Sequence, residues 1–416
     1  MPIAAYVGFA AEHRRFLSFG FVLAFTSSFG QTYFIGIFGP SVQNAFGLSH
    51  TAWGTIYMVG TLCSALLLPW TGKLMDRLDL RVYTGAVCAL LIAACTFMAM
   101  VTGPIMLVVA IFLLRQSGQG LASHVAITSM ARYFDAGRGR AIALATLGFA
   151  FGEAMLPFLA VLAIAGIGWR GTYASIAVLL GLGLIPAVAW LLKGHTDRHR
   201  IYLARLAGPR GDSETRSRSW TRAQVLRDVR FYLLLPGVLA PSLILTAMFF
   251  HHLNLADAKG WSHEWITGSY GIYALAVIAA ALIAGRLVDR FGAARLLPYM
   301  LPPLIIAMTL VAWLSSPWSV WPYLILAGIN TGMALTATSS LWAELYGVEH
   351  LGAIKSMASA LSVFASALGP ISMGGLMDLG LSIDSVCMLF AVFATVGAVL
   401  IVLALRGSRL RTRWVY

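Results

Sequence analysis

Twelve long apolar segments dominate this sequence and leave room for little else. With a window of about 19 residues they lie near 16–38, 52–72, 82–102, 104–126, 141–162, 171–192, 231–253, 266–286, 296–314, 318–341, 353–376 and 385–405, numbered here as spans 1 to 12. A membrane-crossing helix needs about 20 apolar residues, so the spans and their connections account for most of the 416 residues. Only 11% of the residues are charged, against roughly 25% in an average soluble domain. The pattern excludes a disordered chain, a disulfide-stapled secreted domain and a conventional soluble enzyme, and it predicts an all-α polytopic membrane protein.

The distribution of basic residues predicts how the chain is oriented in the membrane. Of the 29 lysines and arginines, 26 lie in the terminal segments, the central stretch or alternate connections, while Arg170 and Lys259 lie on the opposite side and Arg115 lies inside span 4. Because basic loops stay in the cytoplasm, we expect a multi-pass protein of the inner (plasma) membrane with both termini cytoplasmic. The net charge of +13 reflects this asymmetry, so the expected partner is the lipid bilayer and not a nucleic acid.

An internal repeat with one fixed offset divides the chain into halves. Residue n matches residue n + 213, and the matches include Tyr57 with Tyr270, Gly72 with Gly285, Asp76-Arg77 with Asp289-Arg290, and Pro157 with Pro370. Six spans per half give both halves the same orientation, which is the parallel-repeat layout of two-bundle secondary transporters. We therefore predict a cytoplasmic N-terminus at 1–15, six-helix bundles at 16–192 and 231–405, a cytoplasmic linker at 193–230 and a cytoplasmic tail at 406–416.

The most charged part of the repeat predicts a conformational gate. The glycine of each copy allows close approach of two helix ends, and the aspartate can pair with an arginine or cap a neighbouring helix. A pair that forms in one state and breaks in the other would act as a gate, whereas the alternative is a solvated turn with ordinary topogenic charge. The predicted gating residues are Gly72, Asp76, Arg77 and Arg81 in the first half and Gly285, Asp289, Arg290 and Arg295 in the second.

These motifs resemble those of the major facilitator superfamily along essentially the whole chain. The Gly-x-x-x-Asp-Arg loop after spans 2 and 8 matches that family, Arg115-x-x-Gly118-x-Gly120 is similar to its span 4 motif, and Trp169-Arg170-Gly171 is typical of it. The resemblance implies two six-helix bundles that work by alternating access, with spans 1, 4, 7 and 10 lining a central cavity.

The motifs match two groups of transporters within this family in part. Several residues follow the loop 4–5 pattern of monocarboxylate and oxalate–formate type transporters: Tyr133, Phe134, Arg138, Ala141, Ala145, Gly148 and Gly152. Two features of those transporters are missing, namely the acidic-Gly-aromatic pattern in span 1 and a midplane arginine in span 8. The Gly-Pro motif of drug–proton antiporters is also broken, because Glu153 follows Gly152 in span 5.

Two ionisable residues lie deep in the predicted membrane. An ionisable group at this depth needs a partner or a role, and Arg115 in span 4 and Glu153 in span 5 lie at similar depth in neighbouring spans. We expect them to pair, either as a structural ion pair or as a coupling device. In the second case, protonation of Glu153 would free the planar fork of Arg115 for a substrate carboxylate.

Three further residues are predicted to line the cavity. Tyr33 in span 1 can donate a hydrogen bond to an anion, Gln119 shares the helix face of Arg115 at i+4, and Asn330 lies in the middle of span 10. Each of them also has a simple packing interpretation. No cofactor, metal or catalytic residue is expected, because the chain has no phosphate-binding loop and no zinc-ligand spacing.

The sequence thus predicts a secondary transporter and not an enzyme. The favoured activity is transport of a small organic anion, a carboxylate, together with a proton, by a monomer. One alternative is a proton-driven exporter of drugs or hydrophobic metabolites, and another is a membrane sensor on a transporter scaffold.

Overall fold

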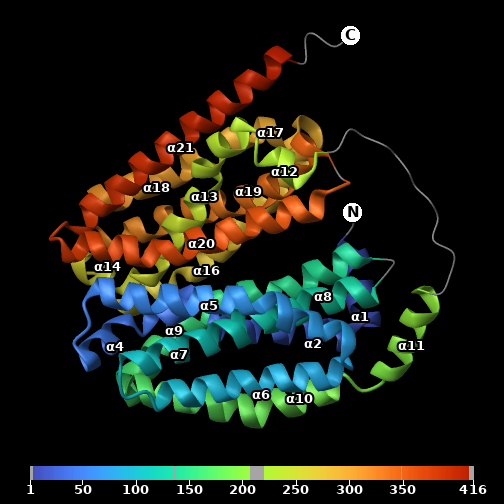
Figure 1. Cartoon of the computed structure of the whole chain (residues 1–416). Helices are drawn as coiled ribbons and strands as arrows, with labels where there is room; N and C mark the ends of the chain where they lie inside the picture. Colours follow the sequence, from blue (N-terminus) through green and yellow to red (C-terminus); the bar gives the residue numbers. More distant parts are fainter. Residues whose placement is uncertain (1–2, 135–136, 207–219, 348, 412–416) are drawn as a thin grey trace. The chain divides into compact units, whose positions relative to one another are not determined.

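The computed structural model describes residues 3–134, 137–206, 220–347 and 349–411, and within them every regular element is helical (Figure 1). Two compact units are present, one of Met1–Gly47 with Ile56–Ser213 and the other of Leu48–Thr55 with Glu214–Tyr416. Residues 207–219 of the predicted linker lie outside the described residues. The domain boundaries given above remain predictions.

The helices of the first unit follow the order of the predicted spans. They are α1 (Ile3–Glu12), α2 (Arg14–Thr26), η1 (Ser27–Gly30), α3 (Thr32–Ile37), α4 (Gly39–Phe46), α5 (His50–Arg77, which begins in the second unit), α6 (Leu80–Ala99), α7 (Pro104–Leu114), η2 (Arg115–Ala122), α8 (Ser123–Tyr133), α9 (Arg138–Leu179), η3 (Leu180–Leu184), α10 (Ile185–Leu191) and α11 (His195–Leu206).

The second unit repeats this order with fewer interruptions. It contains α12 (Arg222–Val225), α13 (Val229–Phe250), α14 (His252–Lys259), α15 (His263–Gly268), α16 (Tyr270–Phe291), α17 (Ala293–Leu296), η4 (Leu297–Tyr299), α18 (Leu301–Trp313), η5 (Pro317–Ser319), α19 (Val320–Tyr346), α20 (Leu351–Asp378) and α21 (Ile383–Arg411).

The two units use the same helix pairs. In the first unit α2 packs along α9 and α6 packs on α9 and α10, and in the second unit α13 packs along α20 and α18 packs on α21. These are the first and fifth, and the third and sixth, spans of each half. The shared pairing confirms the all-α fold of duplicated helix bundles expected from the repeat.

The helical lengths fit twelve membrane crossings. Among the residues that the structure describes, ten helical runs are long and apolar enough to cross a membrane, and the 54-residue run Arg138–Leu191 holds two of the predicted spans. These spans are divided at Gly168, whose φ of 71° lies in the left-handed region that glycine tolerates. Span 1 is not one continuous helix of this length, because it is broken into α2, η1, α3 and α4.

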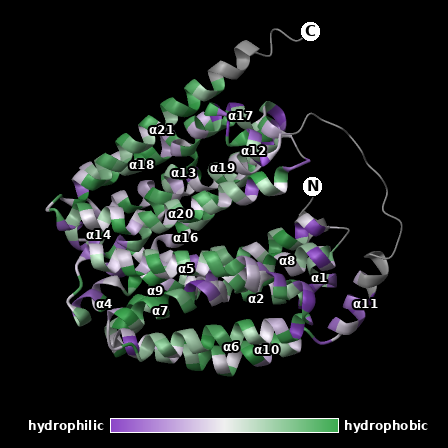
Figure 2. Ribbon diagram, in the orientation of Figure 1, coloured by the Kyte–Doolittle hydropathy of each residue, from purple (hydrophilic) through white to green (hydrophobic). Residues whose placement is uncertain are grey.

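Apolar side chains cover the outer helices as expected for contact with lipid. Figure 2 shows hydrophobic residues along α6, α10 and α21. Large side chains such as Leu182 and Leu403 are 77% and 53% exposed. A soluble protein rarely exposes so much contiguous apolar surface, so these faces are best explained by a bilayer.

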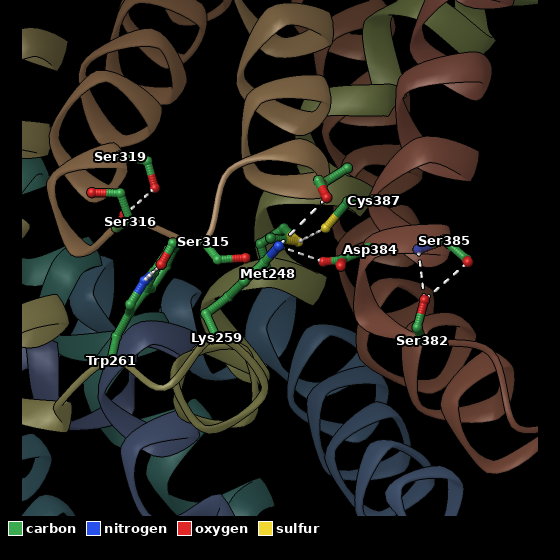
Figure 3. A network of polar contacts seen from close by, with 11 residues as sticks. Met248, Lys259, Trp261, Ser315, Ser316, Ser319, Ser382, Asp384, Ser385 and Cys387 are labelled. Carbon is green, nitrogen blue, oxygen red and sulfur yellow. Dashed lines mark hydrogen bonds and ion pairs between the residues drawn. The ribbon is translucent and has the colours of Figure 1, made fainter.

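An ion pair between a buried lysine and a half-exposed aspartate ties three elements of the second unit together (Figure 3). The Lys259 side chain is only 3% exposed, and its Nζ lies 2.6 Å from Oδ1 of Asp384, at the start of α21. The same ammonium group donates to the Ala312 carbonyl oxygen at 3.4 Å, and the Trp261 indole N–H donates to the Ser315 carbonyl oxygen at 2.8 Å. Since an unpaired buried ammonium would be costly, Asp384 fixes the end of α14 against α18 and α21.

Candidate substrate-binding site

Span 1 is interrupted where the predicted cavity residues lie. The α-helix α2 ends at Thr26, the 3-10 segment η1 follows, and Gln31 is extended with φ −82° and ψ 152° before α3 begins at Thr32. A break of this kind leaves backbone carbonyl and N–H groups without intrahelical partners. Discontinuous helices supply such groups to ligands at the binding sites of many transporters.

The break in span 1 lies directly against an irregular segment of span 4. Residues Arg115–Ala122 form a π-helix, η2. A Cβ atom on Gly30 would lie 2.7 Å from the Gln119 backbone nitrogen, and one on Gly118 would lie 2.7 Å from the Gly30 nitrogen. The two glycines therefore bring two irregular backbones into contact. Because π-helical turns occur frequently at functional sites, this contact is a candidate part of the substrate-binding site.

Arg115 is the first residue of η2 and is a buried cation. Its side chain is 4% exposed. Nη1 donates to the Gly30 carbonyl oxygen at 3.2 Å and, at a long 3.5 Å, to Oγ1 of Thr32. The guanidinium carbon lies 5.3 Å from the ring centre of Tyr57, whose hydroxyl contacts Thr32 at 2.5 Å. In the described part of the chain, no carboxylate forms an ion pair with Arg115.

The predicted ion pair between Arg115 and Glu153 is absent from the described residues. Glu153 is half-buried on α9, and η1 packs against both α9 and η2. At the position before it, a Cβ on Gly152 would lie 3.0 Å from Cβ of Ser28. The two spans are neighbours in sequence, but span 1 contacts both of them at this depth. Similar depth alone therefore did not bring the charges together.

The other three predicted cavity residues fall in two places. Tyr33 is half-buried and its hydroxyl donates to Oγ of Ser28 at 2.8 Å, and Gln119 is half-buried in η2, so both lie at the break in span 1. Asn330 is fully buried in the second unit, where its side-chain amide donates to the Met300 carbonyl oxygen at 2.7 Å. That contact directs Asn330 toward α18 and gives it a structural partner.

Sequence reasoning did not single out Thr32, Tyr57 or Gln116. Gln116 accepts a hydrogen bond from Ser64 at 2.9 Å and donates to Oγ1 of Thr71 at 2.8 Å, which connects η2 to α5. Tyr57 was marked only as a match to Tyr270 in the internal repeat. That repeated position was the one signal in the sequence that could have identified it as a partner of Arg115.

The first copy of the gating motif forms an ion pair with a residue that the prediction omitted. Asp76 pairs with Arg132 at the end of α8, and Arg132 also donates to the Met75 carbonyl oxygen at 3.0 Å. Arg81 pairs with Asp79 at 3.1 Å and not with Asp76. Asp79 also caps α6 by accepting from the Arg81 N–H at 2.8 Å, and this arginine holds the pKa of Asp79 below its usual value.

The second copy of the motif makes different contacts from the first. Asp289 is exposed and has no ion pair among the described residues, because the position equivalent to Arg132 is Leu345. Glu344, one residue earlier, accepts from the Ala293 and Ala294 N–H groups at 2.6 and 3.2 Å. The expected close helix approach is also absent: a Cβ on Gly72 would meet His124 only at 3.6 Å, and one on Gly285 would meet nothing within 4 Å.

This asymmetry predicts unequal effects of two matched substitutions. Asp76→Asn removes the ion pair with Arg132, and the pair is worth about 1 kcal/mol because the Asp76 carboxylate is exposed. We expect it to shift the balance of transport states and to lower the transport rate by about 5-fold. Asp289→Asn should leave the rate unchanged. Uptake rates at equal membrane expression would measure both, and equal losses would contradict the asymmetry.

A histidine of α11 is buried at the same end of the first unit. His195 is 1% exposed, its ring lies 5.1 Å from that of Tyr133 and 5.9 Å from that of His199, and neither ring nitrogen has a partner among the described residues. Burial lowers the pKa of His195 to about 4, opposed by Asp79 and assisted by Arg198, His199 and Arg81. The docked α11 therefore holds His195 in its neutral form.

The docking of α11 should weaken in acid. Undocked His195 takes a proton near its ordinary pKa of 6.5, whereas the docked residue resists protonation until about 4. Neutral His195 therefore contributes to the free energy of docking α11 in full above pH 6.5. This contribution of up to about 3 kcal/mol is lost as the pH falls toward 4. Hydrogen exchange of residues 195–206, corrected for intrinsic rates, should be faster at pH 5 than at pH 7.5. His195→Phe should remove the difference, and an unchanged difference would contradict the assignment.

Comparisons with known proteins agree with this fold. The family model described as Major Facilitator Superfamily matches residues 20–370 and 272–414. A bacterial homologue of the human lysosomal transporter Spinster, inward-facing and occupied, has a TM-score of 0.72 at 17% identity, covering 94% of this chain and 96% of its own. The nucleoside transporter NupG has a TM-score of 0.73 at 14% identity, covering 94% and 98%. A comparison with curated proteins gave no match.

The family match extends over nearly the whole chain and confirms the resemblance seen in its motifs, so the protein belongs to the Major Facilitator Superfamily and is a membrane transporter, not an enzyme.

Proposed function

We propose that this transporter carries a small organic anion, a carboxylate, together with a proton, by alternating access. One observation supports the anion above all others: Arg115 is 4% exposed and has no ion pair among the described residues. A buried guanidinium is expensive without a negative partner. A substrate carboxylate would supply the missing charge and would match the fork of the guanidinium.

The contacts of Arg115 suggest how an anion would bind. The Gly30 carbonyl oxygen uses Nη1, which leaves other N–H groups of the five that a guanidinium carries. The half-buried side-chain amide of Gln119, near the same break, can donate to the second carboxylate oxygen, and the Tyr33 hydroxyl can do so once its proton turns away from Oγ of Ser28. We assign Arg115 as the main substrate-binding residue, with Tyr33 and Gln119 as further donors.

Glu153 is the proposed proton carrier of the first unit. It is half-buried in a predicted span and has no ion pair among the described residues, a setting that favours the neutral acid. Because Glu153 does not contact Arg115, proton and anion do not compete directly for one partner. Coupling would instead pass through span 1, which packs against both η2 and α9.

The test uses proteoliposomes that contain a pH-sensitive dye. A panel of small monocarboxylates is added outside, with a nucleoside such as uridine as an uncharged comparison. Acidification with one or more acids, and none with the nucleoside, is expected. If no acid gives a signal while the nucleoside is taken up, the anion proposal fails and the similarity to NupG gains weight. Resistance to hydrophobic drugs on overexpression would instead favour an exporter.

The topology proposed for this function follows from the basic residues. We propose a monomer in the plasma membrane with both termini and residues 193–230 in the cytoplasm, because 26 of the 29 basic residues would then lie on that side. Reporter fusions at the C-terminus and in the 254–265 connection would test it. The expected result is a cytoplasmic signal for the first fusion and an external signal for the second.

A further inference from the structure

A buried histidine in the second unit has an incompletely satisfied ring. His252 begins α14 and is 0% exposed. Its Nδ1 lies 2.6 Å from the Tyr270 hydroxyl, and the two rings are stacked. Tyr323 of α19 meets the imidazole edge-on with ring centres 5.6 Å apart, and Phe249 of α13 meets it at 5.2 Å. The histidine is therefore enclosed by three aromatic rings from three helices.

Two polar atoms of this cluster lack hydrogen-bond partners among the described residues. They are Nε2 of His252 and the hydroxyl of Tyr323, both fully buried and both without a partner among the described residues. An unsatisfied buried polar group costs about 1–3 kcal/mol. Nε2 has no hydrogen-bond partner in either tautomer: it is an unpaired N–H donor in one and an unpaired acceptor in the other. The second form, with Nδ1–H donating to Tyr270, leaves a basic nitrogen without a partner.

The internal repeat indicates that this histidine replaces a charged partner. Tyr57 and Tyr270 occupy equivalent positions at the offset of 213. In the first unit Tyr57 lies against the cation Arg115. The residue equivalent to Arg115 is Gly328, and Tyr270 contacts His252 instead. Each unit thus places one basic side chain against the repeated tyrosine, permanently charged in the first and titratable in the second.

We propose that His252 is a proton-binding site of the second unit, and that its proton is carried in addition to the one on Glu153. A hydronium ion would deliver the proton to Nε2 and leave as water, and the Tyr323 hydroxyl would then accept a hydrogen bond from the new N–H. The titratable groups in contact with His252 are Tyr270 on α16 and Tyr323 on α19, and His251 precedes it in the sequence. Within the described residues no carboxylate pairs with it, so its charge would not be cancelled.

The inference rests on the proposed function and makes it electrogenic. An anion on Arg115 with protons on Glu153 and His252 moves one net positive charge per cycle. An inside-negative potential of 100 mV should then raise accumulation of the monocarboxylate found in the dye assay by about 50-fold, since one elementary charge crosses the field. Potassium gradients with valinomycin set this potential in proteoliposomes.

Two matched histidine variants separate the site from its neighbour. His252→Asn keeps a polar group near Tyr270 and removes the titratable ring, so it should lose the response to potential and keep substrate-driven acidification. His251→Gln is the control. Its ring also has one nitrogen with a partner, Nε2 on the Pro370 carbonyl oxygen at 3.0 Å, but it lies against the rings of Phe250 and His50 and not in the cluster with Tyr270 and Tyr323, so this variant should respond as the wild type does. Wild-type accumulation that ignores the potential, or a full response in His252→Asn, would overturn the inference.

A direct measurement keeps the inference testable if no monocarboxylate is transported or if His252→Asn does not fold. In ¹⁵N-histidine-labelled protein in nanodiscs, Tyr323→Phe should shift the ring signal of His252 among the signals of the nine histidines, and that signal should titrate. Failure of the dye assay with a titrating His252 signal would reject the substrate class only. A signal that stays neutral from pH 8 to pH 4 would reject the proton site.

Discussion

Arg115→Met is expected to abolish transport of the anionic substrate while leaving the protein as stable as the wild type or more stable. Methionine fills a similar volume but carries no charge. Charge-assisted hydrogen bonds contribute about 1.5–3 kcal/mol each, so losing two of them should lower apparent substrate affinity by about 100-fold or more. Removal of a buried charge that has no ion pair within the described part of the chain should at the same time relieve its desolvation cost.

The stability arm of this experiment distinguishes a binding role from a structural one. If the main task of Arg115 were to satisfy the Gly30 carbonyl oxygen, methionine would leave that oxygen unpaired and lower the melting temperature. Arg115→Lys keeps the charge but loses the fork, so we expect an affinity between those of the wild type and the methionine variant. Arg222→Met, at an exposed position, is the matched control and should change neither property. Normal transport by Arg115→Met would remove Arg115 from the proposed site.

The fold followed from hydropathy and repetition because both are properties of whole segments. A span of about 20 apolar residues has to cross the bilayer whatever its neighbours are. The details of the site depend on which backbones meet. Nothing local in Ser27–Gly30 demands a break, since it has no proline, and η2 contains no signal that separates a π-helix from an α-helix. A hydrophobic pattern with the 3.6-residue period of an α-helix therefore could not predict these 3-10 and π-helical turns.

The charged residues show why matching positions are an incomplete guide. Asp76 and Asp289 match in the repeat, yet the residue that pairs with Asp76 is Arg132, and its equivalent is Leu345. A comparison of the partner positions would have revealed the asymmetry. The Arg115–Glu153 pair failed for a different reason, because depth along a helix fixes only one coordinate of a side chain. Whether two side chains meet depends also on which helix packs beside each of them.

Gly30→Ala is expected to destabilise the protein severely, by about 3 kcal/mol or more. The added methyl group would overlap the Leu114 carbonyl oxygen and lie 2.7 Å from the Gln119 nitrogen and 2.9 Å from Cα of Gly118. All three atoms belong to the backbone, so no side chain can rotate to make room, and the break in span 1 would have to separate from η2. Thermal unfolding of the purified protein and its yield in the membrane measure the effect.

Gly85→Ala is the matched control because Gly85 lies inside α6 and a methyl group there meets nothing within 4 Å. Alanine is favoured over glycine inside a helix by about 1 kcal/mol, so this variant should be as stable as the wild type or slightly more stable. Equal stability of the two variants would mean that spans 1 and 4 do not touch through Gly30 and Gly118. If Gly30→Ala folds partially, it should also lose anion binding, since the contact that it disrupts is the one that brings the Gly30 carbonyl oxygen to Arg115.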